Sequence, residues 1–212
     1  MFELSKLTKS TEDFKKYVEP QLYDSGLFNP DTSYLVTCEG ANDDLRTKMD
    51  MYAGIDMCTV DMQNQCVQGI ASRVQRGRCY NTFTVRAITD NGSLETEFRK
   101  RSLAITNGNM YPTWTVQAYI YDDVNDITKE ICTAGIIRTT DLFDYIINQL
   151  KGKGLHTWQD FIDMLHNTSH IGELDIRSVP GGAIFLSCDW NCIQHHGINV
   201  DVLNGVFDRQ GG

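Results

Sequence analysis

Apolar residues at helical spacing alternate along the chain with runs that favour strands. The helical spacing predicts helices over residues 11–27, 43–51, 93–106 and 141–150. In the first of these, Phe14, Tyr17 and Val18 share one face, Pro20 marks a kink or a second start, and Gly26 ends the helix. In the third, Ser93 precedes two glutamates in a pattern that resembles a capping box.

Strands are predicted over residues 55–60, 66–74, 82–88 and 114–121, and a further strand over 127–137 is expected to pair with the fourth. The turn signal Asp90-Asn91-Gly92 follows the third strand. The order through residue 150 is helix, three strands, helix, one or two strands, helix. This order predicts a mixed α/β layer sandwich.

Lys151-Gly152-Lys153-Gly154 is the strongest boundary signal in the chain. After it, Thr157 is expected to cap a helix, and short strand-like pieces follow around Ile176, at 183–188 and at 200–207. We therefore expect an α/β core over residues 1–150 and a small C-terminal α+β extension over 151–212.

The composition is that of a globular protein, with 41% hydrophobic and 22% charged residues. No stretch approaches the roughly 18 apolar residues that a membrane span requires. The N-terminus lacks the apolar segment of a secretory signal, and the seven cysteines are odd in number and scattered in spacing. We therefore expect a protein without a membrane partner, located in the cytoplasm, with reduced thiols.

Charge is distributed unevenly over a chain whose net charge is −9. Residues 67–101 carry seven basic and three acidic side chains, a net charge of +4, whereas the remainder carries twelve basic and twenty-five acidic ones, or −13. This segment predicts either a local anion site or a solvated hairpin. Arg73, Arg76, Arg78 and Arg86 are its candidate nucleic-acid contacts.

Asp50 and Asp56 lie six residues apart with Gly54 between them. A turn at Gly54 would bring both carboxylates to one strand end, where oxygen ligands suit a divalent cation such as Mg²⁺. Alternatively, Asp50 faces solvent and Asp56 accepts hydrogen bonds from a turn. We name both as candidate metal ligands.

Two strand faces next to these carboxylates carry arginine. Arg73 and Gln75 share a face of the second strand with Ala71, and Arg86 lies on the third. Arginines on adjacent strands repel each other unless an anion or a carboxylate lies between them. The hypothesis is a phosphate contact at Arg73, with Gln75 beside it; the alternative is an Asp56–Arg73 pair with no ligand.

The element order and Gly54-Ile55-Asp56 resemble the PD-(D/E)XK nuclease superfamily, whose first acid follows glycine and an apolar residue. The resemblance covers about residues 12–150. It implies a restriction-endonuclease-like fold and Mg²⁺-dependent phosphodiester hydrolysis. The family's acid-x-lysine motif falls on Ala71-Ser72-Arg73, and arginine is a poor base, so the second acid would be Asp50 or Glu95.

The strings GIASRVQ, FTVR and YPTWTVQAY are similar in character to uncharacterised proteins of phages and mobile elements. Our leading hypothesis is a nuclease-like protein that acts on or binds nucleic acid or a nucleotide. The alternative is a non-catalytic acidic protein that inhibits a host defence factor which binds nucleic acid.

Cys188, Cys192, His195 and His196 form the one metal-like spacing in the sequence, to which His166 and His170 could add. Structural zinc needs four ligands that close around the ion. Because the spacing differs from the usual ligand pairs, we expect buried thiols here rather than zinc.

Overall fold

A computed structural model describes residues 12–24, 26, 28–29, 31–38, 44–89, 92, 96–120 and 131–204 of the chain. The architecture is mixed α/β, as the pattern predicted, and it divides into two compact units. The first unit comprises residues 1–81, 112–137 and 201–212, and the second comprises 82–111 and 138–200. The expected boundary at residues 151–154 falls inside the second unit, between two of its helices.

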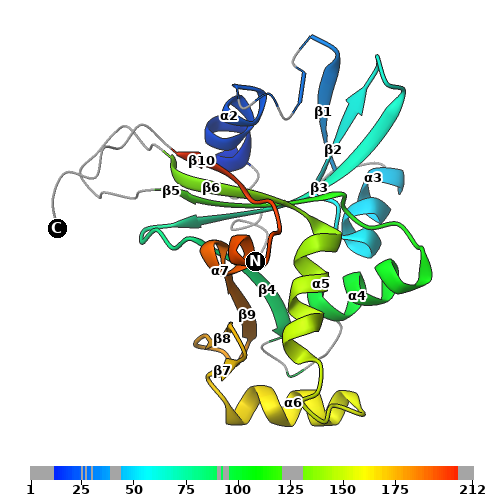
Figure 1. Ribbon diagram of the computed structural model, residues 1–212. Helices are drawn as coiled ribbons and strands as arrows, with labels where there is room; N and C mark the ends of the chain where they lie inside the picture. Colours follow the sequence, from blue (N-terminus) through cyan, green and yellow to red (C-terminus); the bar gives the residue numbers. More distant parts are fainter. Residues whose placement is uncertain are drawn as a thin grey trace, which may run out of the picture. The chain divides into compact units, whose positions relative to one another are not determined.

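The first unit is built on a six-stranded mixed sheet in the order β1-β2-β3-β5-β6-β10 (Figure 1). Its strands are β1 (Ser33–Thr37), β2 (Met57–Asp61), β3 (Cys66–Arg76), β5 (Trp114–Ile120), β6 (Ile131–Arg138) and β10 (Asp201–Asn204). Neighbours β1, β2 and β3 are antiparallel, β3 and β5 are parallel, and β10 is antiparallel to β6.

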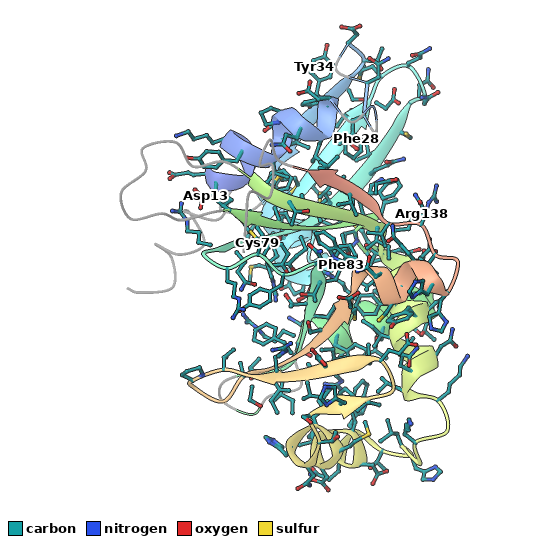
Figure 2. The ribbon with its side chains drawn as sticks, turned by 60° about the vertical axis from the view of Figure 1, so that its left-hand side comes forward. Asp13, Phe28, Tyr34, Cys79, Phe83 and Arg138 are labelled. Atoms are coloured by element: carbon teal, nitrogen blue, oxygen red, sulfur yellow. The ribbon has the colours of Figure 1, made fainter. Side chains whose placement is uncertain are left out.

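The N-terminal helix of the first unit covers one face of this sheet. It consists of a π-helical turn, η1 (Phe14–Val18), that continues into α2 (Glu19–Asp24). Pro20 lacks the amide hydrogen that a regular helix needs at this point, and the π turn ends two residues before it. Buried apolar side chains of helix and sheet form one cluster, of which Phe28 is labelled in Figure 2: Phe14, Val18, Leu22, Phe28, Met57, Ile70, Val116, Ala118, Ile120, Ala134 and Ile136.

A second helical segment of this unit, α3 (Asp44–Lys48) followed by η2 (Met49–Ala53), ends at Gly54, whose φ of 65° is left-handed. Glycine adopts this conformation without the steric cost that a side chain brings. The segment packs through Ala53 and Ile55 against Cys58 of β2. A Cβ atom at Gly69 would lie 2.9 Å from the Ile55 side chain, so glycine permits this close packing.

The second unit contains an antiparallel sheet in the order β4-β9-β8-β7. Its strands are β4 (Thr82–Ile88), β7 (His170–Ile171), β8 (Leu174–Ser178) and β9 (Ile184–Asp189). The prediction that the 82–88 strand lies beside the 66–74 strand is therefore wrong. Strand β4 pairs with β9, about one hundred residues later in the chain, and β3 has β5 as its neighbour instead.

Four helices complete the described part of the second unit: α4 (Glu97–Asn107), α5 (Thr139–Leu150), α6 (Trp158–Asn167) and α7 (Trp190–His195). Phe98 of α4 stacks on Phe143 of α5 and on Phe161 of α6, with ring centroids 6.0 and 5.2 Å apart. The predicted cap of α6 is confirmed: Thr157 Oγ1 accepts the Asp160 N–H at 3.2 Å, and Asp160 Oδ2 accepts the Thr157 N–H at 2.8 Å.

Among the residues that the structure describes, none of the helices combines the length and the apolar character that crossing a bilayer would demand.

Candidate functional site

Asp56, the first of the predicted metal ligands, directly precedes β2 and is bound to the backbone of β3. Its Oδ2 accepts the Ser72 N–H at 2.6 Å and lies 3.4 Å from the Ser72 hydroxyl. Its backbone N–H donates to the Ile70 carbonyl at 3.0 Å. These contacts fasten the start of β2 to its neighbour, so the carboxylate has a structural task in the sheet.

Asp50 lies in η2, where its backbone carbonyl accepts the Gly54 N–H at 2.9 Å. Burial raises the pKa of its carboxyl group because desolvation favours the neutral form. Nowhere in the described residues do three His, Cys, Asp or Glu side chains gather. Because the Asp56 carboxylate is already engaged by the Ser72 amide, we derive no step through a metal.

The remaining residues of the predicted catalytic set lie on β3 or outside the described residues. Arg73 and Gln75 are half-buried on β3, where their register partners are Gln117 and Tyr119 of β5. Glu95 lies outside the described residues. The expected neighbourhood of Arg73 and Arg86 on adjacent strands does not form, because these residues belong to different sheets.

Two other predicted nucleic-acid contacts are engaged within the first unit. Arg76 forms an ion pair with Asp13 through Nη2, and its Nε donates to Asp13 Oδ2 at 2.8 Å. The two side chains are only 21% and 10% exposed, so this pair joins the N-terminal helix to β3. The guanidinium of Arg78 lies over the ring of Tyr80 at 5.8 Å, and both residues are exposed.

Arg86, the fourth predicted contact, lies on the polar face of the second sheet. Strand registers place two rows of side chains across this face. One row contains Thr84, Ser187, Asp175 and His170, and the other contains Arg86, Phe185 and Arg177. The opposite face carries the apolar residues Phe83, Val85, Leu186 and Cys188, which are fully buried.

The second row places one aromatic ring between two cations. The Arg86 guanidinium lies over the Phe185 ring at 5.4 Å, and Arg177 is the register partner of Phe185 on the other side. Both arginines are exposed, and Phe185 is half-buried. An aromatic ring with flanking arginines on an antiparallel sheet can stack a base and contact phosphates.

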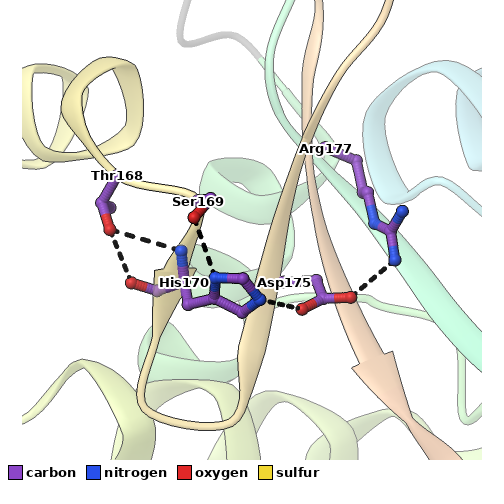
Figure 3. A network of polar contacts seen from close by, with 5 residues as sticks. All are labelled: Thr168, Ser169, His170, Asp175 and Arg177. Atoms are coloured by element: carbon purple, nitrogen blue, oxygen red, sulfur yellow. Dashed lines mark hydrogen bonds and ion pairs between the residues drawn. The ribbon is translucent and has the colours of Figure 1, made fainter.

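The first row ends in a hydrogen-bonded chain of polar groups (Figure 3). His170 Nδ1 lies 2.8 Å from the Ser169 hydroxyl, and His170 Nε2 lies 2.9 Å from Asp175 Oδ1. Arg177 donates to the second oxygen of Asp175 at 2.6 Å. The exposed guanidinium of Arg177 thus offsets part of the negative charge of Asp175 at this face.

Glu173, at the turn between β7 and β8, forms a second polar cluster of this unit. Its Oε2 accepts the Tyr145 hydroxyl at 2.9 Å and lies 3.0 Å from His196 Nε2. The hydrogen bond from Tyr145, with a smaller contribution from His196, lowers the pKa of Glu173. Burial and the bond to Glu173 raise the pKa of Tyr145. These shifts stabilise a neutral tyrosine beside an ionised glutamate.

The residues of the zinc-like spacing have other surroundings. Cys188 is buried in β9, and burial raises the pKa of its thiol. Burial also raises the pKa of Cys192, whereas His196 is bound to Glu173. The described part of the chain therefore assembles no set of zinc ligands from these residues.

The expectation of uniformly reduced cysteines is wrong at Cys79. Free thiols are present at Cys38, Cys58, Cys66, Cys188 and Cys192, whereas Cys79, labelled in Figure 2, is disulfide-bonded. Uniformly reduced thiols were inferred from an odd count and scattered spacing, and neither observation shows which cysteines meet in space.

Sequence reasoning did not single out Phe185 or Arg177, and it mentioned His170 only as a zinc candidate. A local signal was present: Asp175 and Arg177 alternate with Leu174 and Ile176, as expected of a strand with one polar face. The pairing of β8 with β9 and of β9 with β4 brings these residues to Arg86, and that pairing has no local signature.

Searches among protein-family models, curated proteins and solved structures found no match to this chain.

Proposed function

We propose that the chain binds single-stranded nucleic acid, or a nucleotide, on the polar face of the β4-β9-β8-β7 sheet. The observation that carries the proposal is the row Arg86–Phe185–Arg177, in which an aromatic ring is flanked by two exposed cations. Stacking of a base on an aromatic side chain is worth about 1–3 kcal/mol and is sequence-tolerant. Guanidinium groups supply bidentate contacts to phosphate oxygens.

Charge in the second unit is compatible with an anionic ligand. This unit carries eight basic and ten acidic residues, whereas the first carries eleven and eighteen. The Arg177–Asp175 pair is exposed, at 57% and 36%, so its ion pair is worth about 0–1 kcal/mol. A phosphate can therefore replace or share this contact at little cost. The binding mode that we propose needs no metal ion.

The experiment is fluorescence anisotropy with labelled single-stranded RNA and DNA of mixed sequence at low salt. Phe185→Ala should weaken binding by about 5- to 150-fold, the equivalent of 1–3 kcal/mol. Tyr34→Ala is the matched control, because Tyr34 is an aromatic residue on a strand of the first sheet and is 60% exposed. Equal losses in the two variants, or no binding by the wild type, would overturn the proposal.

A second candidate function, binding of a basic protein, is favoured by the surface of the first unit. Residues 17–72 contain nine carboxylates and only two basic side chains. The same segment exposes six large apolar residues: Tyr34, Leu45, Met51, Tyr52, Met62 and Val67. Apolar side chains within an acidic surface suit a partner of opposite charge.

This second candidate predicts that basic proteins bind the immobilised chain at low salt and are released as salt rises. Leu45→Ser combined with Tyr52→Ser should weaken that binding, because both side chains are exposed. Phe185→Ala should leave it unchanged. If binding of the basic protein is lost in Phe185→Ala, the partner binds to the second unit and not to the first.

A further inference from the structure

The His170 ring is held between a hydroxyl and a carboxylate in a way that fixes its tautomer (Figure 3). The Asp175 carboxylate accepts a hydrogen bond from His170 Nε2. In the neutral ring the hydrogen therefore resides on Nε2 and the lone pair on Nδ1. The Ser169 hydroxyl, 2.8 Å from Nδ1, is therefore a donor to that lone pair. A hydroxyl group thus fits at the basic nitrogen of an oriented histidine.

The backbone around this histidine is fixed as well. The Thr168 hydroxyl donates to the His170 carbonyl at 2.7 Å and accepts the His170 N–H at 3.3 Å. Strand pairing places His170 directly opposite Asp175, and Arg177 holds the other oxygen of that carboxylate at 2.6 Å. Base and orienting carboxylate therefore sit on two paired strands and not on separate loops.

We propose that the polar face of the second sheet is a metal-independent ribonuclease site. Its substrate is single-stranded RNA, and His170 is the general base. The inference rests on the proposed function, because it requires RNA on the row Arg86–Phe185–Arg177. Phe185 and His170 lie two strands apart, about 10 Å across the sheet, and two residues apart along the strands, about 7 Å. An RNA strand with one base stacked on Phe185 can therefore place the ribose of a neighbouring nucleotide at His170.

In the reaction, His170 Nδ1 takes the proton of a ribose 2′-hydroxyl after the Ser169 hydroxyl turns aside. The 2′-oxygen forms a bond to the adjacent phosphorus, and the bond from phosphorus to the 5′-oxygen breaks. Water protonates the leaving oxygen, and the resulting hydroxide takes the proton from His170. The products are a 2′,3′-cyclic phosphate and a 5′-hydroxyl.

The other side chains have distinct tasks in this step. Arg177 stabilises the negative charge that builds up on the phosphoryl oxygens. Asp175 is a positioning residue, because it acts through the tautomer and orientation of His170. A general base of this kind contributes roughly 10²- to 10⁴-fold to the rate. DNA is not a substrate, since it lacks the attacking hydroxyl.

The test uses the full chain in EDTA with a labelled single-stranded RNA under single-turnover conditions. We expect cleavage that leaves cyclic phosphate ends. His170→Gln should slow it by at least about 100-fold without changing the affinity for a 2′-O-methyl RNA, which cannot be cleaved. His166→Gln is the matched control, because His166 is an exposed histidine at the end of α6. It should cleave at the wild-type rate.

The variant Asp175→Asn tests whether Asp175 positions His170 for catalysis or contributes to RNA binding. It should slow cleavage while affinity for the 2′-O-methyl RNA stays equal or rises, because a negative charge has been removed. A weaker affinity with an unchanged single-turnover rate would overturn the positioning role.

The outcomes distinguish the two proposals. Binding of 2′-O-methyl RNA without cleavage of RNA would overturn the ribonuclease inference and leave the proposed function standing. Failure to bind any RNA or DNA would overturn both. Cleavage of DNA, or equal cleavage by wild type and His170→Gln, would show that the 2′-hydroxyl and His170 are not the reacting pair.

Discussion

The two sheets use their polar residues in different ways. In the first sheet, β5 is buried along nearly its whole length, and polar groups such as Asp56 and Arg76 are engaged by the protein itself. In the second, one face is buried and the other presents Arg86, Arg177 and His170 to solvent. A charged residue is thus evidence for a binding site only when the fold leaves it exposed to solvent, which its place in the sequence does not reveal.

The largest expected effect concerns the buried ion pair of the first unit. Asp13→Ala removes the carboxylate that pairs with Arg76, whose side chain is only 21% exposed, and should destabilise the protein by about 3 kcal/mol in urea unfolding. Asp44→Ala is the control, because its partner Lys48 is 61% exposed and the destabilisation should stay below about 0.5 kcal/mol. Equal losses of unfolding free energy in the two variants would show that the Asp13–Arg76 pair stabilises the protein no more than an exposed ion pair does.

The salt dependence of nucleic-acid affinity shows which of the two sheets binds the nucleic acid. Replacing Arg86 and Arg177 together by glutamine should flatten the logarithmic salt slope of nucleic-acid binding by about two units, because each guanidinium is expected to neutralise one phosphate. The same change at Lys48 and Arg78, two exposed cations of the first unit, should leave the slope in place. If the second pair changes the slope and the first does not, nucleic acid binds to the first unit.

A smaller effect is expected at the start of α6 in the second unit. Thr157→Ala removes the hydroxyl that accepts the Asp160 N–H and should destabilise the protein by about 1 kcal/mol. Thr106→Ala removes an exposed hydroxyl that donates to the Ser102 carbonyl in α4, and it should be nearly neutral in the same unfolding measurement. A neutral result at Thr157 would mean that packing alone sets the stability of α6.

The smallest effect is a pH dependence in the second unit. The folded protein lowers the pKa of Glu173 below its usual value of 4.5, so its contribution to stability is present above that pH and disappears as the pH falls further. Glu173→Gln should therefore reduce the loss of stability on acidification below pH 4.5, measured by urea unfolding at several pH values. Parallel losses in wild type and variant would exclude Glu173 as a contributor.

Local patterns predicted most elements because their causes are local. Gly54 ends a helix, Thr157 caps one, and the alternation at 82–88 defines β4. The sequence pattern did not predict β1, because five residues beside a turn are too few to show alternation. It did not predict α7 either, because the capping residue of that helix, Asp189, is also the last residue of β9.

The site was harder to predict because it depends on partners distant in sequence. Gly54-Ile55-Asp56 indicated a metal ligand, but the Ser72 amide that binds Asp56 lies sixteen residues away on another strand. Arg86 was named as a nucleic-acid contact, yet its neighbour Phe185 comes from β9 and joins it only through strand pairing. Residue type at one position therefore indicated chemistry, and the pairing of strands determined where that chemistry gathers.

The chain passes between its two units more than once, and this affects how the protein can form during synthesis. In the second sheet, β4 has no partner strand until the residues of β9, 184–189, have been synthesised. In the first sheet, β6 has no β10 beside it until residues 201–204 follow. A nascent chain would therefore display open edges on β4 and β6 until those residues emerge. Such edges recruit other strands, so the growing polypeptide should depend on chaperones more than a protein with continuous units would.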